Sequence, residues 1–328
     1  MQRFIVTGGL GFIGSNLIEL LLSKKFKVLN IDRVNYASNT YNVKDFFKNK
    51  NYSFVKANIN DQNKILSILN KFKPHGIFNL AAETHVDRSI DGPKNFIQSN
   101  IVGTFNLLEC FKDYSKKYKS KLVHISTDEV YGDILSGRSS EIYPYKPSSP
   151  YAASKAASDH LVYSYVRTYN LPAIITNCSN NYGPKQHDEK LIPTIIRNAL
   201  QGNPIPIYGD GKNIRDWLYV LDHCKGIDLV YHKGEKGQTY NIGGRNERTN
   251  LQIVDRICAI LDERLPKAKS YKDQVTFVQD RAGHDRRYAI DATKLEHELG
   301  WQADENFDTD TNLDLNVVSK RDGISFKK

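Results

Sequence analysis

The sequence predicts an α/β protein built on a doubly wound parallel sheet, with a smaller mixed α/β lobe after it. Three observations lead to this class. Short apolar runs alternate with helical stretches along the first half of the chain, a glycine-rich turn follows the first run, and the composition changes near residue 178. The chain has 328 residues, a length typical of about two domains.

Strand and helix signals alternate in chain order before residue 178. The runs expected to form strands are Arg3–Thr7, Lys27–Ile31, Ser53–Lys56, Gly76–Leu80, Lys121–Ser126 and Leu171–Asn177. The stretches with helical spacing are Ser15–Leu22, Asp61–Phe72, Asn95–Tyr114 and Tyr151–Tyr169. Such alternation predicts parallel βαβ units with helices on both faces of the sheet.

Proline and glycine become frequent after residue 178, and the regular alternation of strands and helices ends there. We therefore expect a first domain over residues 1–178 and a second lobe of loops and short elements over residues 179–328. The chain is expected to cross back to the first domain around residues 217–241. The tail from Asp304 is polar and weakly periodic, which is typical of a partly unstructured terminus.

Composition narrows the classes of protein. Hydrophobic residues make up 40% and charged residues 25%, as in ordinary soluble globular chains. No apolar run is long enough to span a bilayer, and the first residues lack the core of a signal peptide. The cysteines, Cys110, Cys178, Cys224 and Cys258, are far apart and predict apolar filler rather than disulfides or a metal site. A cytoplasmic location without a membrane partner is expected by default.

The net charge of +9 invites a nucleic-acid partner. No helix-turn-helix, zinc-finger or basic-aromatic pattern accompanies that charge, and the lysines are scattered along the chain. We therefore expect no nucleic acid, and the binding reading stays a weaker alternative that steeply salt-dependent DNA binding would revive.

A glycine turn carries the first functional signal. Gly8, Gly11 and Gly14 follow a strand and open a helix, so that the backbone can approach a pyrophosphate at the helix N-terminus. Asp32 ends the next strand, where a carboxylate accepts hydrogen bonds from the ribose hydroxyls of NAD and repels a 2′-phosphate. Arg33 is a mild counterweight, because a guanidinium could pair with that phosphate. The pattern predicts a Rossmann-like domain that binds NAD.

A tyrosine and a lysine form the second signal. Tyr151 and Lys155 lie four residues apart on an expected helix and share a face. A lysine ammonium favours the phenolate, so we expect Lys155 to lower the pKa of Tyr151 and to make it a base. Thr127 ends a strand of the sheet, where doubly wound folds place their ligands, and could bind the oxygen that is oxidised.

Adjacent acids form the third signal. Asp128 and Glu129 come directly after the strand that ends at Thr127. On their own they would be read as a solvated turn. Beside a nicotinamide site, one acid can protonate a leaving group while the other removes a proton from carbon.

These residues carry a resemblance. The segments TGGLGFIG, NLAAETHVDRSI, HISTDEVYG, PYAASKAASDHLV, CSNNYGP, EKLIP, PIYGDGKNIRDWLYV, TYNIGG and DRAGHDRRYAID resemble the extended short-chain dehydrogenase/reductase family over nearly the whole chain. Within it they are most similar to the nucleotide-sugar 4,6-dehydratases, in particular to the dTDP-glucose branch. The related 4-epimerases lack the acid pair, and the decarboxylases keep only the glutamate.

The resemblance implies a hydro-lyase reaction. Tyr151, held by Lys155 and aided by Thr127, would take the proton of the glucose C4 hydroxyl while the C4 hydride passes to NAD. Glu129 would then remove the acidified C5 proton, and Asp128 would protonate the leaving C6 hydroxyl. Water would leave, and return of the hydride to C6 and of a proton to C5 would give a nucleotide-linked 4-keto-6-deoxyglucose for deoxysugar biosynthesis. A homodimer through the helices near Asn95–Tyr114 and Tyr151–Tyr169 is implied as well.

The resemblance also implies binding residues. Besides the glycine turn, Tyr151 and Lys155, NAD would contact Phe12, Ile13, Asp32, Arg33, Asn35, Asn58, Ile59, Leu80, Ala81, Ala82, Thr84, Ser99 and Asn181. The nucleotide sugar would contact Thr84, Thr127, Asn180, Lys190, Leu191, Pro206, Tyr208, Arg215, Asn250, Arg281 and His284. Arginines suit the diphosphate because a guanidinium offers forked donors to phosphate oxygens.

Departures from the family pattern leave alternatives open. Asn58 stands where an aspartate is usual, Ala282 replaces a usual proline, and the aromatic-rich C-terminal helix is not visible from Asp304 on. The last departure leaves the nucleobase open between dTDP and UDP. A UDP-glucose or UDP-N-acetylglucosamine 4,6-dehydratase, or a 4-epimerase, is the alternative reading.

Overall fold

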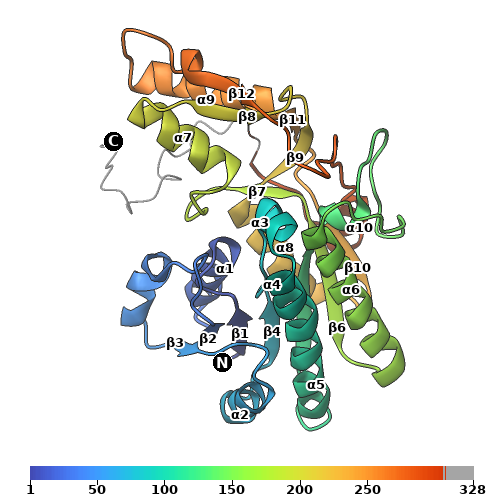
Figure 1. The fold of residues 1–328 in the computed structure, drawn as a ribbon. Helices are drawn as coiled ribbons and strands as arrows, with labels where there is room; N and C mark the ends of the chain where they lie inside the picture. The colour runs from blue at the N-terminus through green and yellow to red at the C-terminus, as the bar shows by residue number, and fades with distance from the viewer. Residues whose placement is uncertain (306, 308–328) are drawn as a thin grey trace.

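The computed structural model describes residues 1–305 and 307 of the chain. The expectations for the rest of the C-terminal tail, including the missing aromatic helix, lie outside the described residues. Figure 1 shows a large layered part that carries the N-terminus and a smaller part formed by later segments of the chain.

A parallel sheet forms the centre of the large part, with the strand order β10-β6-β5-β4-β1-β2-β3. Its strands are β1 (Arg3–Thr7), β2 (Lys27–Asp32), β3 (Tyr52–Lys56), β4 (Gly76–Asn79), β5 (Lys121–Thr127), β6 (Ala173–Cys178) and β10 (Thr239–Ile242). The order reverses between β1 and β4, and such a reversal opens a crevice at the carboxyl ends of the strands. The predicted doubly wound sheet is confirmed.

Helices cover both faces of this sheet, as Figure 1 shows. One face packs against α1 (Phe12–Ser23), α8 (Val220–Lys233) and α10 (Thr293–Leu299). The other packs against α2 (Gln62–Phe72), α5 (Gly103–Ser115) and α6 (Pro150–Tyr169). Side chains alternate between the two faces along β1. Phe4 and Val6 therefore pack in the layer with α1, and Ile5 packs in the layer with α2.

The predicted helix over Asn95–Tyr114 is longer and less regular than expected. The short helices α3 (Val86–Asp91) and α4 (Lys94–Phe96) precede it, and a π-helical turn over Ile97–Val102 leads into α5. A 3₁₀ helix of nine residues spans Thr40–Lys48, and single 3₁₀ turns occur at Asp128–Tyr131 and Tyr271–Gln274. The turn at Asp128–Tyr131 directly continues β5 and fixes the direction of the acid pair.

The smaller part is more regular than the sequence suggested. It contains β7 (Asn180–Tyr182), β9 (Ile214–Tyr219) and β11 (Glu247–Thr249) in one sheet, and β8 (Ile205–Tyr208) paired with β12 (Val275–Val278). Helices α7 (Leu191–Gln201) and α9 (Asn250–Arg264) share a buried apolar cluster with these strands. The predicted mixed α/β lobe is confirmed, and its strands are short as expected, but α7 and α9 are regular helices that the frequent prolines and glycines concealed.

Helix α9 illustrates this regularity. Thr249 and Gln252 form a capping box at its start, and Ile253, Val254 and Ile257 bury one face.

Other expectations from composition can also be compared with the fold. The cysteines are free and buried, as predicted for apolar filler. None of the helices in the described part of the chain combines the length and apolar character that a membrane span requires.

Candidate active site

A cavity of about 300 Å³ lies at the carboxyl ends of the central strands. Its lining contains every residue that the sequence assigned to NAD and every residue assigned to catalysis. Of the predicted substrate residues it contains Thr84, Thr127, Asn180 and Lys190. The others, Leu191, Pro206, Tyr208, Arg215, Asn250, Arg281 and His284, lie outside that lining. A crevice is therefore present where the strand order reverses, and the residues predicted to bind NAD and to catalyse the reaction line it.

In the glycine turn, backbone segments of the protein approach one another so closely that side chains would not fit between them. Gly8 has φ +72°, and a Cβ on it would lie 2.9 Å from the Leu80 carbonyl oxygen. A Cβ on Gly14 would lie 2.5 Å from the Gly8 carbonyl oxygen. Helix α1 starts at Gly11 without a side-chain cap, so its first N–H groups remain available to an anion. The residues present therefore fit a dinucleotide pyrophosphate.

Asp32 is held at the edge of the cavity by its neighbours. Its Oδ2 accepts a hydrogen bond from Leu10 N at 3.1 Å, and its Oδ1 accepts from Val34 N at 2.8 Å and from Ser38 Oγ at 2.7 Å. A carboxylate has lone pairs left after these bonds, so it can still accept from ribose hydroxyls. The loop after β2 thus orients the residue that was predicted to select NAD.

Arg33 does not present a free guanidinium to a 2′-phosphate. It forms an ion pair with Glu83 and donates to Ser99 Oγ at 2.9 Å. Asn35 donates to the same Glu83 carboxylate at 2.8 Å. Because Glu83 already neutralises this arginine, the counterweight to an NAD preference is weaker in the structure than in the sequence.

The acid pair lies at the end of β5, with Asp128 buried and Glu129 half-buried. Thr127 donates to Asp128 Oδ1 at 3.3 Å and accepts from Glu129 N at 3.3 Å. Asp128 Oδ2 and Glu129 Oε2 are buried without a hydrogen-bond partner. Buried polar atoms are rarely left unpaired in proteins, so these two oxygens point to groups that a ligand brings.

Burial raises the pKa of both carboxyls, but their surroundings differ. The pKa of Asp128 is raised well above its usual range, first by burial and then by the charges of Glu129 and Asp216. The pKa of Glu129 is also raised by burial, but the charges of Arg281, Arg215 and Lys190 oppose the rise. Such a difference separates a proton donor from a proton acceptor. The environments favour Asp128 as the acid and Glu129 as the base.

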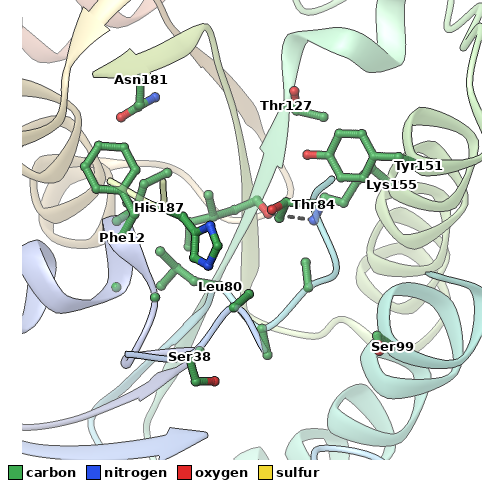
Figure 2. A pocket seen from close by; sticks show the side chains of 18 of the residues that line it. Phe12, Ser38, Leu80, Thr84, Ser99, Thr127, Tyr151, Lys155, Asn181 and His187 are labelled. Carbon is green, nitrogen blue, oxygen red and sulfur yellow. Dashed lines mark hydrogen bonds between the residues drawn. The ribbon is translucent and has the colours of Figure 1, made fainter. Parts of the chain in front are cut away.

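Helix α6 delivers the tyrosine and the lysine. Ser149 caps its start by accepting from Ala152 N at 3.1 Å, which places Tyr151 in the first turn. Figure 2 shows the Tyr151 hydroxyl pointing into the cavity near Thr127, with Lys155 behind it and with Phe12 across the cavity. Tyr151 and Lys155 therefore share one face of α6, as predicted, and this face lies beside Thr127.

The predicted lowering of the Tyr151 pKa is wrong. Burial, followed by the charge of Glu129, raises the pKa of the Tyr151 phenol well above its usual range. Lys155 Nζ donates to the carbonyl oxygen of Ile125 at 2.8 Å. Desolvation and a nearby carboxylate therefore set the direction of the shift.

Basic residues of the smaller part gather beyond the acid pair. Arg215 is buried, donates to the Asp285 carbonyl oxygen at 2.9 Å and lies over the Tyr288 ring at 4.1 Å. Arg281 pairs with Asp87 Oδ1 at 3.4 Å. The charge of Arg215 lowers the pKa of both acids and that of Arg281 lowers the pKa of Glu129, although neither arginine lines the cavity.

The remaining predicted substrate residues lie on the same side. Tyr208 donates to Asp87 Oδ2 at 3.3 Å, and Lys190 donates to the Thr84 carbonyl oxygen at 3.1 Å. His284 contacts Asp280 Oδ1 at 2.5 Å. Leu191 and Asn250 begin helices α7 and α9, and Pro206 lies in β8.

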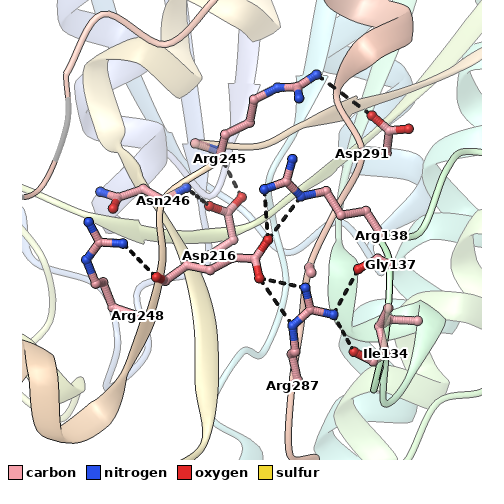
Figure 3. Close-up of polar contacts among 12 residues, drawn as sticks. Ile134, Gly137, Arg138, Asp216, Arg245, Asn246, Arg248, Arg287 and Asp291 are labelled. Carbon is pink, nitrogen blue, oxygen red and sulfur yellow. Dashed lines mark hydrogen bonds and ion pairs between the residues drawn. The ribbon is translucent and has the colours of Figure 1, made fainter.

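A clamp of arginines fixes the segment that follows the acid pair (Figure 3). Arg287 donates to the carbonyl oxygens of Ile134 at 2.7 Å and Gly137 at 2.8 Å, and it pairs with Glu247 at 2.6 Å. Arg138 pairs with the same glutamate at 2.9 Å. Because Glu247 begins β11, which pairs with β9, the clamp ties the catalytic segment to the strand that carries Arg215.

Sequence reasoning missed several lining residues. Cys178 ends β6 beside β5, so the rule that ligands lie at strand ends could have found it. Ser38 and His187 come from loops that no motif in the sequence marks, whereas Glu189 opens the EKLIP segment. Asn58 lines the cavity, and its side-chain oxygen accepts from Asn60 N at 3.0 Å.

Comparison with known proteins places the chain in a family. Residues 5–311 match the model of the GDP-mannose 4,6 dehydratase family. A probable dTDP-glucose 4,6-dehydratase of Sinorhizobium fredii is 52% identical over 315 residues, which cover 94% of this chain and 90% of the relative.

Solved structures agree with the sequence matches. The dTDP-glucose 4,6-dehydratase of Bacillus anthracis in complex with NAD has a TM-score of 0.88 at 42% identity, and 98% of each chain is covered. The dTDP-glucose 4,6-dehydratase DesIV of Streptomyces venezuelae, with NAD and TYD bound, has a TM-score of 0.90 at 41% identity with the same 98% coverage of each chain. The chain therefore belongs to the dTDP-glucose 4,6-dehydratases of the extended short-chain dehydrogenase/reductase family.

Proposed function

We propose that this protein is an NAD-dependent dTDP-glucose 4,6-dehydratase, which converts dTDP-glucose to the 4-keto-6-deoxyglucose derivative and water. The buried acid pair carries the proposal. Asp128 and Glu129 each hold an unpartnered oxygen in the same cavity as Tyr151. Oxidation alone needs no such pair, whereas elimination of water across C5 and C6 needs one acid and one base.

The glycine turn and Asp32 hold the cofactor in this proposal. The pyrophosphate lies against Gly8, Gly11 and the N-terminus of α1, and Asp32 accepts from the adenosine ribose. NAD, when bound, supplies a positively charged ring that accepts a hydride from C4 of the sugar and returns it to C6. The remaining cofactor contacts are those that line the cavity beside β2, β4 and α6.

Tyr151 acts first in the reaction. Its phenolate oxygen takes the proton of the C4 hydroxyl and becomes the phenol, and Thr127 binds the same C4 oxygen while it becomes a ketone. Lys155 stabilises the negative charge on the phenol oxygen during this transfer. Because burial raises the pKa of Tyr151, positive charge in the cavity favours the phenolate that this step needs.

The acid pair acts second. The new ketone acidifies the C5 proton, and Glu129 removes it. Asp128, kept protonated by its raised pKa, gives a proton to the C6 hydroxyl, and water leaves. The different surroundings of the two carboxyls therefore match their two tasks.

Cations of the smaller part bind the nucleoside diphosphate. Arg215 and Arg281 offer forked donors to phosphate oxygens, and Lys190 adds a point charge beside them. Thr84 and Asn180 contact the hexose, and Pro206 and Tyr208 frame the nucleoside with Leu191. Asn250 and His284 complete the ribose and phosphate contacts.

We also propose that the protein forms a homodimer through the side of α5 and α6. Figure 1 shows these helices side by side. Ile97 and Phe105 are 42% and 43% exposed there, and Ile90 and Tyr169 add apolar surface. Sedimentation at several concentrations tests this, since a double substitution of Ile97 and Phe105 by glutamate should give monomers. A wild-type protein that stays monomeric at every concentration would refute it.

Parallel incubation with dTDP-glucose and UDP-glucose, without added NAD, tests the function. We expect a 4-keto-6-deoxy product from dTDP-glucose and turnover supported by NAD that is retained during purification. Keto product from UDP-glucose alone would move the assignment to the UDP branch. Conversion to the galactose isomer without keto product would instead identify a 4-epimerase.

A further inference from the structure

Asp159 is a buried acid that the proposed reaction does not use. It lies one helical turn after Lys155 on α6 and has 0% of its surface exposed. Ser126 Oγ donates to its Oδ2 at 2.7 Å, and the Tyr145 hydroxyl donates to the same oxygen at 3.1 Å. Two side-chain hydroxyls, one from β5 and one from the loop before α6, therefore hold this carboxyl oxygen in the core. A carboxylate buried in this way is stabilised by a nearby positive charge.

Lys155 is a buried cation on the same face of the helix. It is 4% exposed, and its Nζ donates to the carbonyl oxygen of Ile125 at 2.8 Å. Ile125 and Ser126 are consecutive in β5, so one strand fixes both the lysine and the acid. Burial lowers the pKa of Lys155, while the charge of Asp159 raises it.

His124 is the other basic group beside the acid. Its Nε2 lies 3.3 Å from Asp159 Oδ1, and its ring also contacts Ser158 and Asn79. Burial, followed by the charge of Lys155, lowers the pKa of His124 below its usual range, so the ring is neutral at neutral pH. Lys155, four residues earlier on α6, is the other basic side chain near the acid, and the charge of Asp159 raises its pKa.

The other titratable groups around the pair are uncharged at neutral pH. Burial raises the pKa of each of the groups concerned, which are Tyr131, Tyr145, Tyr163 and Cys178. Tyr131 and Tyr145 come from the segment between β5 and α6, Tyr163 lies on α6 itself, and Cys178 ends β6. A change of charge at Asp159 is therefore felt first by Lys155.

We propose that Asp159 is a positioning residue that keeps Lys155 protonated and directed toward Tyr151, a role that rests on the proposed function of the Tyr151–Lys155 pair. The acid touches neither the sugar nor the cofactor in this account. It acts through the lysine, whose ammonium would otherwise lose its proton in the desolvated space behind the cavity.

NMR titration of Lys155 tests this without turnover. Proteins with carbon-labelled lysine are compared as wild type, Asp159→Asn and Tyr145→Phe, and a Lys155→Gln protein assigns the signal. We expect the titration midpoint of Lys155 to fall by about 1 to 3 pH units in Asp159→Asn, since an opposite charge has been removed. Tyr145→Phe is the matched control, because it deletes a hydrogen bond to the same oxygen and keeps the charge.

The rate of C4 oxidation in a single turnover gives a second measurement. This step precedes the elimination, so the titration of Asp128 does not limit it. We expect Asp159→Asn to lose this rate at a lower pH than the wild type does, with KM for the nucleotide sugar within about twofold. Asp159→Glu, which keeps the charge, should restore most of the profile.

The outcomes separate the two proposals. A lowered Lys155 midpoint in a protein without dehydratase activity would support Asp159 and refute the proposed function. An unchanged midpoint, or a uniform loss of rate without a change in its pH dependence, would reduce Asp159 to a structural role and overturn the inference. If Asp159→Asn does not fold, the wild type still decides: a Lys155 that is neutral at neutral pH would overturn the inference.

Discussion

Replacement of Asp128 by asparagine tests whether Asp128 is the proton donor while Glu129 is the base. The change keeps the shape of a buried side chain whose Oδ2 has no partner, so the amide disturbs few contacts. It removes the proton that the C6 hydroxyl needs. We expect water elimination to slow while C4 oxidation continues, so that reduced nicotinamide accumulates before any 4-keto-6-deoxy product forms.

The size of the effect follows from the isolation of Asp128. General acid catalysis contributes about 10²- to 10⁴-fold in rate. The adjacent carboxyl, Glu129, is engaged as the base, and no hydrogen-bond partner on Asp128 Oδ2 can relay a proton instead. The loss should therefore fall in the upper half of that range, about 10³- to 10⁴-fold, which corresponds to about 4 to 5.4 kcal/mol in barrier height.

Rapid-mixing absorbance of reduced nicotinamide, combined with quenched samples for the sugar products, measures both steps. Asp133→Asn is the matched control. Asp133 is exposed, accepts from Arg287 N at 2.8 Å and lies outside the cavity lining, so this variant should turn over normally. Steady turnover in Asp128→Asn that equals the wild-type rate would refute the assigned role of the acid.

The Asp128→Asn variant should also be more stable than the wild type at neutral pH. Because the pKa of Asp128 is raised in the folded protein, the unfolded chain releases this proton first as the pH rises. Wild-type stability therefore falls as the pH rises from about 3.9 toward the folded pKa, and asparagine removes that cost. Thermal unfolding should show a higher midpoint for the variant at neutral pH and equal midpoints in acid. A lower midpoint at neutral pH would contradict the raised pKa.

Four further predictions concern other parts of the site. Tyr151→Phe should reduce C4 oxidation by about 10²- to 10⁴-fold, and near-normal formation of reduced nicotinamide would contradict its role as the base. Glu129→Gln should remove the acid limb from the pH profile of elimination, because the raised pKa of Glu129 sets the pH below which the base is protonated; an unchanged limb would exclude it. Arg281→Gln should raise KM about tenfold to a hundredfold with a smaller change in kcat, since a hydrogen bond to a charged group contributes about 1.5 to 3 kcal/mol; an unchanged KM would remove it from the diphosphate site. Gly14→Ala should give protein that is purified without NAD, because its Cβ would lie 2.5 Å from the Gly8 carbonyl oxygen; full NAD content would refute the turn geometry.

Local constraints explain what the sequence could predict. Gly8 and Gly14 are required by backbone distances within one turn, and Asp32 ends a strand that pairs directly with the strand before that turn. Thr127 and the acid pair follow from the rule that parallel strands present their carboxyl ends to the ligand. Such features depend on residues close together in the sequence, so spacing reveals them.

Long-range contacts explain what the sequence could not predict. The raised pKa of Tyr151 is a sum over burial and charges from several elements, and spacing to Lys155 alone gave the wrong sign. The ion pair of Arg33 with Glu83 joins residues fifty positions apart. The regular helices of the smaller part were concealed by the prolines and glycines between them, although their apolar period is present in the sequence.

The central claim is an internal transfer of hydrogen from C4 to C6 of one sugar, assisted by the acid pair. Incubation with dTDP-glucose that carries deuterium at C4, followed by NMR of the product, tests this most directly. We predict a 4-keto-6-deoxy sugar with the deuterium on the C6 methyl group. Deuterium that remains at C4, or that is lost to water, would contradict it.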